Sequence, residues 1–187
     1  MNTRKNPNPQ GKGLVPVLQG LQKHWDTLVV PPKHIDQISI ELFTSLYVLQ
    51  SEFKFAPVVG NQYWMYEKAG KYRLMLVGPG EWGATLPGRC IGLCELQKDR
   101  TWTLELQPEV AADIQFMQEI DDRRLRLENL LEKAVSLEEA LPSCEIELGY
   151  QGRVLAFILG RSLRASMQLS GINALSYSEA KGMLGRD

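Results

Sequence analysis

The sequence predicts an α+β protein in which an antiparallel β-meander packs against two main helices and is extended by a second, C-terminal set of strands. Three observations carry this prediction. Apolar and polar residues alternate from 55 to 106 between glycine-containing turns, as in half-buried strands. Apolar residues recur at helical spacing on either side, in 36–53 and 108–141. Alternation returns in 144–170, which suggests the second set of strands.

Composition indicates a single globular domain. The chain has 187 residues, of which 44% are hydrophobic and 23% charged, which is ordinary globular usage. The net charge of -1 argues against the basic surface of a dedicated nucleic-acid-binding protein. The charge is uneven, because residues 105–147 hold twelve acids and four bases, a local net of -8. Basic ends, including Arg153, Arg161 and Arg164, leave weak nucleic-acid binding as an alternative.

The N-terminal region divides into an arm and the start of the domain. Residues 1–13 are rich in Asn, Pro, Gly and Lys, which predicts a flexible arm. Residues 14–187 form the predicted domain, and its first stretch, 14–30, has the apolar spacing of a short helix. No secretory signal or membrane-spanning run is recognised, so we expect a cytoplasmic protein. The three cysteines are then expected as thiols.

The first main helix is expected over 36–53, after the Pro31-Pro32 pair and with Asp36 as N-cap. Two apolar stripes run along it. A helix with two such stripes should be buried on more than one side. The first stripe is Ile38, Leu42, Ser45 and Leu49, and the second is Ile40, Phe43 and Tyr47.

Two hairpins account for the alternation that follows. Residues 62–67 pair with 72–77 about a turn at Gly70, and residues 90–96 pair with 101–106 about Lys98-Asp99. Residues 78–88 hold four glycines and two prolines, which predicts a long structured loop. In the last strand three apolar residues face the core: Trp102, Leu104 and Leu106.

An acidic helix is expected over 108–141, between Pro108 and Pro142. It carries a heptad seam that contains one arginine, Arg123. The seam would lie against the first helix or against a copy from another chain, and spacing does not decide between them. The acidic helix therefore offers a surface for self-association or for a protein partner. The interface candidates are Phe116, Ile120, Leu127, Leu130 and Leu137.

The tail from 144 onward has two interpretations. A helix over 153–169 competes with a set of three strands over 144–170. Gly152 and Gly160 punctuate the segment as strand ends would, which favours the strands. Residues 176–184 suggest a terminal turn of helix.

Candidate chemistry concentrates in the loop. The chain lacks the common hydrolase and nucleotide-binding motifs, so no catalytic residue is assigned. Neither histidine has metal ligands at a suitable spacing, and Cys90 and Cys94 would share a strand face too far apart to bind one metal. We therefore expect no metal or cofactor. The residues that are candidates for binding a ligand are Glu81, Trp82, Tyr63, Trp102 and Arg89.

A structural alternative applies to the same loop. Trp82 would plug the open end of the sheet, and Glu81 would cap neighbouring backbone N–H groups. A single carboxylate without a partner base is weak evidence for catalysis. This structural alternative is therefore preferred.

Three motifs follow one another along the chain: F-x-P-x-x-G-x-x-Y-x-x-Y, a P-x-E-W-G loop and a T-W strand. Together they resemble a family of small proteins catalogued as a domain of unknown function, with bacterial and some eukaryotic members. The resemblance covers about residues 36–106 and implies the domain without an activity. Gly80 stands where the family has an acid, so no role with two loop carboxylates is implied. The matching positions are Phe55, Pro57, Gly60, Tyr63, Tyr66, Pro79, Glu81, Trp82, Gly83, Thr101 and Trp102.

These observations favour a non-catalytic binding or interaction module over an enzyme. The alternative is a sensor or enzyme for a small molecule, with a pocket lined by Trp82, Tyr63 and Trp102 and polarised by Glu81. A structure distinguishes the two hypotheses, because the small-molecule pocket requires the four side chains to converge.

Overall fold

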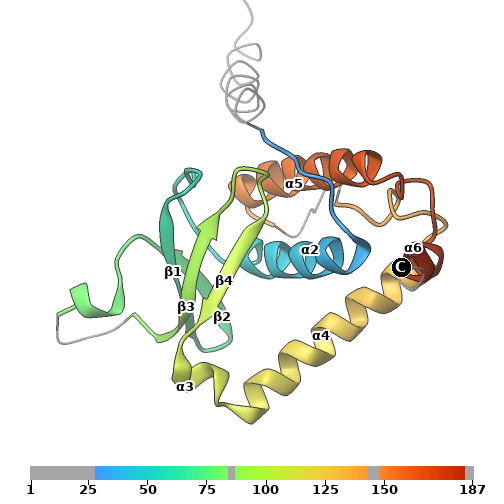
Figure 1. Ribbon diagram of the computed structural model, residues 1–187. Helices are drawn as coiled ribbons and strands as arrows, with labels where there is room; N and C mark the ends of the chain where they lie inside the picture. Colours follow the sequence, from blue (N-terminus) through green and yellow to red (C-terminus); the bar gives the residue numbers. More distant parts are fainter. Residues whose placement is uncertain (1–27, 84–86, 143–147, 184–187) are drawn as a thin grey trace, which may run out of the picture.

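The computed structural model describes residues 28–83, 87–142 and 148–183, and in it the protein is α+β, with a four-stranded antiparallel sheet beside a group of helices (Figure 1). The arm at 1–13 and most of the helix predicted at 14–30 lie outside the described residues. The strands are β1 (Gln62–Lys68), β2 (Lys71–Met75), β3 (Arg89–Leu96) and β4 (Trp102–Leu106). The helices are α2 (Ile35–Leu49), α3 (Pro108–Ala111), α4 (Ile114–Lys133), α5 (Tyr150–Leu169) and α6 (Tyr177–Met183), with a short 3-10 turn, η1 (Pro79–Glu81).

Both predicted hairpins are confirmed. Lys68 pairs with Lys71, and the two turn residues between them, Ala69 and Gly70, have φ angles of 52° and 74°. Two consecutive positive φ angles make the tight turn whose twist matches that of the strands. In the second hairpin Arg100 has a φ of 69° and closes the turn around Lys98-Asp99.

The strand order differs from a simple meander. It is β2-β1-β3-β4, so β1 rather than β2 is the neighbour of β3. The long connection after β2 allows this order, because it lets the chain return past β1 before β3 begins. The sheet is antiparallel as predicted, but a meander is the wrong topology.

A β-bulge in β3 changes which residues share a face. Met65 pairs with Gly92 and Tyr66 with Cys90, so Ile91 is the extra residue between them. One extra residue reverses the alternation. Cys90 therefore lies on the opposite face from Cys94, and the shared face expected for the two thiols is wrong.

Helix α2 packs along the inner face of the sheet. Its first stripe, including Leu42 and Leu49, is buried in the core, and the Ser45 hydroxyl accepts a hydrogen bond of 2.9 Å from the Trp102 backbone N–H. The helix begins at Ile35 and ends at Leu49, earlier than predicted. Its second stripe is covered only in part, because Ile40 is 56% exposed whereas Tyr47 is 3% exposed.

The predicted helix over 108–141 is broken into shorter pieces. Helix α3 ends at Ala111, and α4 starts anew where the Asp113 side chain accepts a hydrogen bond of 3.1 Å from the Phe116 N–H. Aspartate at an N-cap favours a new start over a continuous helix. Helix α4 holds five acids and four bases, so most of the acidic excess lies outside it.

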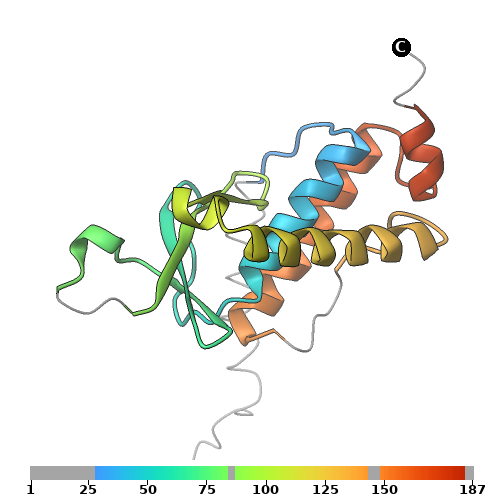
Figure 2. The ribbon, with the colours of Figure 1, turned by 90° about the horizontal axis from the view of Figure 1, so that it is seen from below.

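The C-terminal segment is helical, and the strands predicted for 144–170 are wrong. Helix α5 lies alongside α2 in both views (Figures 1 and 2). A Cβ at Gly160 would lie 2.2 Å from the Pro142 carbonyl oxygen. The glycine thus marks a close approach between two segments, not the end of a strand. The predicted terminal helix turn is confirmed as α6.

We expect Gly160→Ala to destabilise the protein by at least about 2 kcal/mol, because the added methyl group overlaps a backbone oxygen that cannot move independently. Urea unfolding measures this change. Gly182→Ala in α6 is the matched control, since a Cβ there meets nothing within 4 Å. Alanine has the higher helix propensity at both positions, so equal stabilities of the two variants would contradict the packing role.

Candidate functional site

The loop after β2 forms a folded unit on the outer face of the sheet. Glu81 Oε1 accepts a hydrogen bond of 2.9 Å from the Gly78 backbone N–H. Trp82 Nε1 donates to the Tyr66 hydroxyl at 3.0 Å, and the two rings meet edge to face. Burial raises the pKa of Tyr66, against the opposing effect of the Trp82 hydrogen bond. These contacts match the structural alternative for Glu81 and Trp82.

The five sequence-predicted ligand residues lie in three separate places. Tyr63 and Trp102 are each 1% exposed and pack edge to face within the core. Glu81 and Trp82 belong to the loop, and Arg89 begins β3 beside the start of α4. The structure does not bring these side chains together into one pocket. A ligand-binding role for any of them stays a prediction.

A buried ionic cluster forms around Lys33, which is 4% exposed. Its ammonium pairs with the carboxylates of Glu41 on α2 and Asp99 in the β3–β4 turn. Asp99 Oδ1 also accepts hydrogen bonds from the Thr101 N–H at 3.2 Å and the Thr101 hydroxyl at 2.7 Å. Burial raises the pKa of Asp99, but the hydrogen bonds from Lys33 and Thr101 outweigh it and lower that pKa.

Two serines on α5, Ser162 and Ser166, and the residue that caps its C-terminus, Ser170, also bind the segment around Lys33 and the Asp99 turn. The Ser162 hydroxyl donates to the Asp99 carbonyl. One turn further along, the Ser166 hydroxyl donates to the Pro31 carbonyl at 2.6 Å. The Ser170 hydroxyl donates to the Lys33 carbonyl at 2.8 Å and accepts from the Lys33 N–H at 2.8 Å. Because the cluster joins the segment before α2 to two other elements, its geometry is that of a structural tether.

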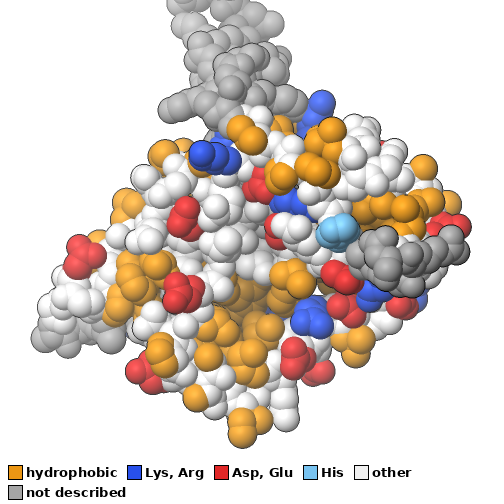
Figure 3. Space-filling view, in the orientation of Figure 1, with side chains coloured by type: hydrophobic (Ala, Val, Ile, Leu, Met, Phe, Trp, Pro, Cys, Tyr) orange, Lys and Arg blue, Asp and Glu red, His pale blue; other side chains and the backbone are white. Residues whose placement is uncertain are grey.

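Two pockets that share Arg123 in their lining, here together called the α4 groove, lie between α4 on one side and α2 and β2 on the other. Hydrophobic side chains gather in a hollow there, with a basic side chain beside it (Figure 3). Its polar half has a volume of about 290 Å³ and is lined by Glu67, Gly70, Tyr72, Arg89, Ile91, Asp113, Gln115, Phe116, Glu119 and Arg123. Its apolar half has a volume of about 510 Å³ and is lined by Phe43, Leu46, Tyr47, Gln50, Arg123, Arg126, Leu127 and Leu130.

Arg123 stands at the junction of the two halves. Its guanidinium lies 5.6 Å from the centroid of the Tyr47 ring and 5.9 Å from that of Tyr72. The two rings are themselves 5.3 Å apart, and Phe43 stacks on Tyr47 at 6.2 Å. The floor of the groove is therefore an aromatic row with a cation above it.

The Tyr47 hydroxyl lies within this floor. Burial, followed by the neighbouring Tyr72 hydroxyl, raises the pKa of Tyr47. No hydrogen bond of normal geometry reaches the Tyr47 hydroxyl from the described residues. A buried hydroxyl without such a bond costs stability, which is a common feature of surfaces that serve a purpose other than stability.

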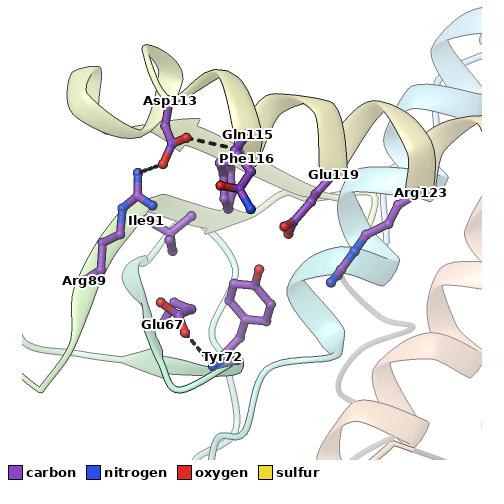
Figure 4. A pocket seen from close by; sticks show the side chains of 10 residues that line it. Glu67, Tyr72, Arg89, Ile91, Asp113, Gln115, Phe116, Glu119 and Arg123 are labelled. Atoms are coloured by element: carbon purple, nitrogen blue, oxygen red, sulfur yellow. Dashed lines mark hydrogen bonds and ion pairs between the residues drawn. The ribbon is translucent and has the colours of Figure 1, made fainter.

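In the polar half of the groove, charged side chains in the lining pair with one another (Figure 4). Arg89 forms an ion pair of 2.8 Å with Asp113 and lies over the Phe116 ring. The Phe116 N–H, followed by Arg89, lowers the pKa of Asp113. Glu119 and Tyr72 point into the cavity from α4 and β2 (Figure 4). This end of the groove is polar and its ion pair fixes the first turn of α4.

The five predicted interface residues do not form one exposed seam. Phe116 and Leu137 are buried in the core, and Ile120 is half-buried against it. Leu127 and Leu130 line the apolar half of the groove, where Leu130 is 63% exposed. Phe116 also lines the polar half of the groove, so three of the five predicted interface residues lie in its lining.

Several residues that line the α4 groove were not predicted from the sequence, although two features of the sequence pointed to it. The second stripe of α2 supplied Phe43 and Tyr47, and the arginine within the heptad seam was Arg123. An arginine in an apolar seam indicates that the seam is open at that point. Tyr72 was one of the strand aromatics considered for ligand stacking and judged more suited to core packing, and Arg126 gave no signal of its own.

No protein-family model matches the chain, and no solved structure matches it. Within residues 28–83, 87–142 and 148–183, no helix is long and apolar enough to cross a membrane, and no group of three or more His, Cys, Asp or Glu side chains is placed to hold a metal ion.

We expect Asp99→Asn to lower the free energy of unfolding at pH 7 by about 3 kcal/mol, because it leaves the buried Lys33 ammonium with one carboxylate partner fewer. The folded pKa of Asp99 is below its unfolded value of about 3.9. Its contribution is therefore present above that value and is lost as the pH falls through the folded pKa.

Urea unfolding at a series of pH values from about 6 to about 2 measures this effect. Asp99→Asn should show a shallower loss of stability on acidification than the unaltered protein. Asp121→Asn, at an exposed position on α4, is the control and should preserve the full slope. If the free energy of unfolding fell equally steeply with pH in Asp99→Asn and in the unaltered protein, the proposed tethering role of the Lys33 cluster would be refuted.

Proposed function

We propose that the protein is a non-catalytic interaction module that binds a helical segment of a partner protein in the α4 groove. The proposal keeps the function expected from the sequence, and it moves the binding surface from the β2–β3 loop and the outer seam of the acidic helix to the groove. It rests on how little of α4 the fold buries.

Helices α4 and α5 are the same length but are packed very differently. In α4 two of twenty residues are buried, whereas in α5 ten of twenty are buried. The apolar residues that remain uncovered in the groove include Leu130 of α4, at 63% exposure. Apolar surface that a fold leaves uncovered in one place supports an interaction site there.

The shape of the groove favours a helix as the bound element. Along α4 the groove extends from Phe116 to Leu130, about 20 Å at the rise of an α-helix. That length matches about four turns of a second helix. Helices α4 and α2 form the walls of its apolar half, and an amphipathic helix laid between them would place its apolar stripe on the aromatic row.

We expect Leu130→Glu to weaken binding of an amphipathic helical peptide by at least tenfold, because the carboxylate would lie in the apolar half of the groove. The probe is a fluorescein-labelled, fourteen-residue peptide with leucines on one helical face and glutamine on the others. Fluorescence anisotropy measures its dissociation constant.

Leu125→Glu is the matched control on the same helix. Leu125 is 58% exposed, similar to Leu130, and it does not line the groove. The substitution should leave the dissociation constant within about twofold of its original value. Equal weakening by the two substitutions, or no binding to the unaltered protein, would overturn the proposed function.

A further inference from the structure

The apolar half of the α4 groove carries a charge of one sign. Its lining includes two arginines, Arg123 and Arg126, and no carboxylate. The two residues are three positions apart on α4, so their side chains project from the same helix about one turn apart. Figure 3 shows a basic side chain beside the hydrophobic hollow in this region.

Neither arginine has its charge neutralised by a partner among the residues that the structure describes. The neighbouring Arg124, by contrast, pairs with Glu128 at 3.3 Å on another side of α4. The guanidinium carbon of Arg123 lies 5.6 Å from the centroid of the Tyr47 ring and 5.9 Å from that of Tyr72. A cation–π contact does not neutralise the charge, and a guanidinium has five N–H donors with which to bind a carboxylate.

The chain itself is a poor source of an occupant. Residues 1–23 hold four bases and no acid, so the N-terminal region would bring like charges to the arginines. A second copy docked groove to groove would bring two further arginines to the same surface, and two-fold symmetry places the residues nearest the axis against their own counterparts. Like charges at a contact oppose both arrangements.

We infer that the α4 groove selects a partner helix whose apolar stripe is flanked by two aspartate or glutamate residues one turn apart, an inference that rests on the proposed function. The apolar stripe lies on Phe43, Leu127 and Leu130, and the two carboxylates pair with Arg123 and Arg126. Charge pairing at a groove rim contributes mainly to partner choice and to the rate of association.

The open shape of the groove favours a peptide over a lipid. A fatty acid would satisfy the same chemistry with its single carboxylate and its apolar chain. Sites for small ligands enclose most of the ligand surface, whereas Leu130 at the rim of this groove is 63% exposed. A helix carries its own polar face, which can remain in solvent.

Three fluorescein-labelled peptides of equal length test the inference. They share one leucine stripe and differ at two flanking positions one turn apart, which are both Glu, both Gln or both Lys. We expect the Glu peptide to bind the full chain at least about fivefold more tightly than the Gln peptide, and the Lys peptide to bind most weakly. Raising the salt concentration should reduce the difference between the Glu and Lys peptides.

Arg126→Gln should reduce the preference for the Glu peptide over the Gln peptide by at least about threefold, and Arg126→Glu should make the Lys peptide the tighter binder. Arg124→Gln removes the same charge from the adjacent position outside the groove, and it should preserve the preference. Circular dichroism confirms that each variant is folded.

The outcomes distinguish failure of the inferred charge preference from failure of the proposed helix-binding function. Equal binding of the Glu, Gln and Lys peptides would overturn the inference about charge and leave the groove as a helix-binding site. Binding of no peptide would overturn both, and binding of dodecanoate under those conditions would identify a lipid site instead. Loss of the Glu preference in Arg124→Gln, with no loss in Arg126→Gln, would place the acidic contact outside the groove.

Discussion

The buried ion pairs of Lys33 are the constraint on which the arrangement of the helices depends. Lys33 precedes α2, Glu41 lies on α2, and Asp99 lies in the β3–β4 turn. Because a buried charge without its partners is costly, these contacts fix α2 relative to the sheet in position and in rotation. The serines of α5, among them Ser166, bind the segment around Lys33 from the opposite side. Helix α2 is therefore held between the sheet and α5.

Fixing the rotation of α2 determines which of its faces remains uncovered. Leu42 faces the core, Phe43 lies in the wall of the groove, and Tyr47 is buried at its floor. Helix α4 forms the opposite wall, and the Arg89–Asp113 ion pair fixes the first turn of α4 beside the end of the sheet. From that end α4 runs diagonally toward α6 (Figure 1), and it crosses α2 and α5 in the view of Figure 2. The groove thus follows from two ionic contacts, one at each end of β3.

The parts of this fold that sequence predicts are the local ones. The Gly70 turn and the alternation around it specify the first hairpin, because a positive φ and a period of two are properties of neighbouring residues. The order of the strands and the helical tail depend on distant contacts. Gly160 has the same appearance in the sequence whether it ends a strand or passes a carbonyl group, and only the nearby Pro142 distinguishes these cases. For the groove, the two stripes of α2 were visible in the sequence, but which of their residues remain exposed depends on how distant elements pack against them.

Arg123 connects the stability of α4 with the proposed selectivity of the groove. It occupies a position in the heptad seam at which an apolar residue would allow α4 to pack more closely on α2. Its guanidinium instead rests on Tyr47 and Tyr72, which keeps a charge at the floor of the groove without burying it unpaired. A hydrophobic residue there would strengthen the contact between the helices and close the junction between the two halves. Arg123 therefore leaves α4 less closely packed on α2 and keeps the surface open and positively charged. A binding site requires such a surface, and a core does not.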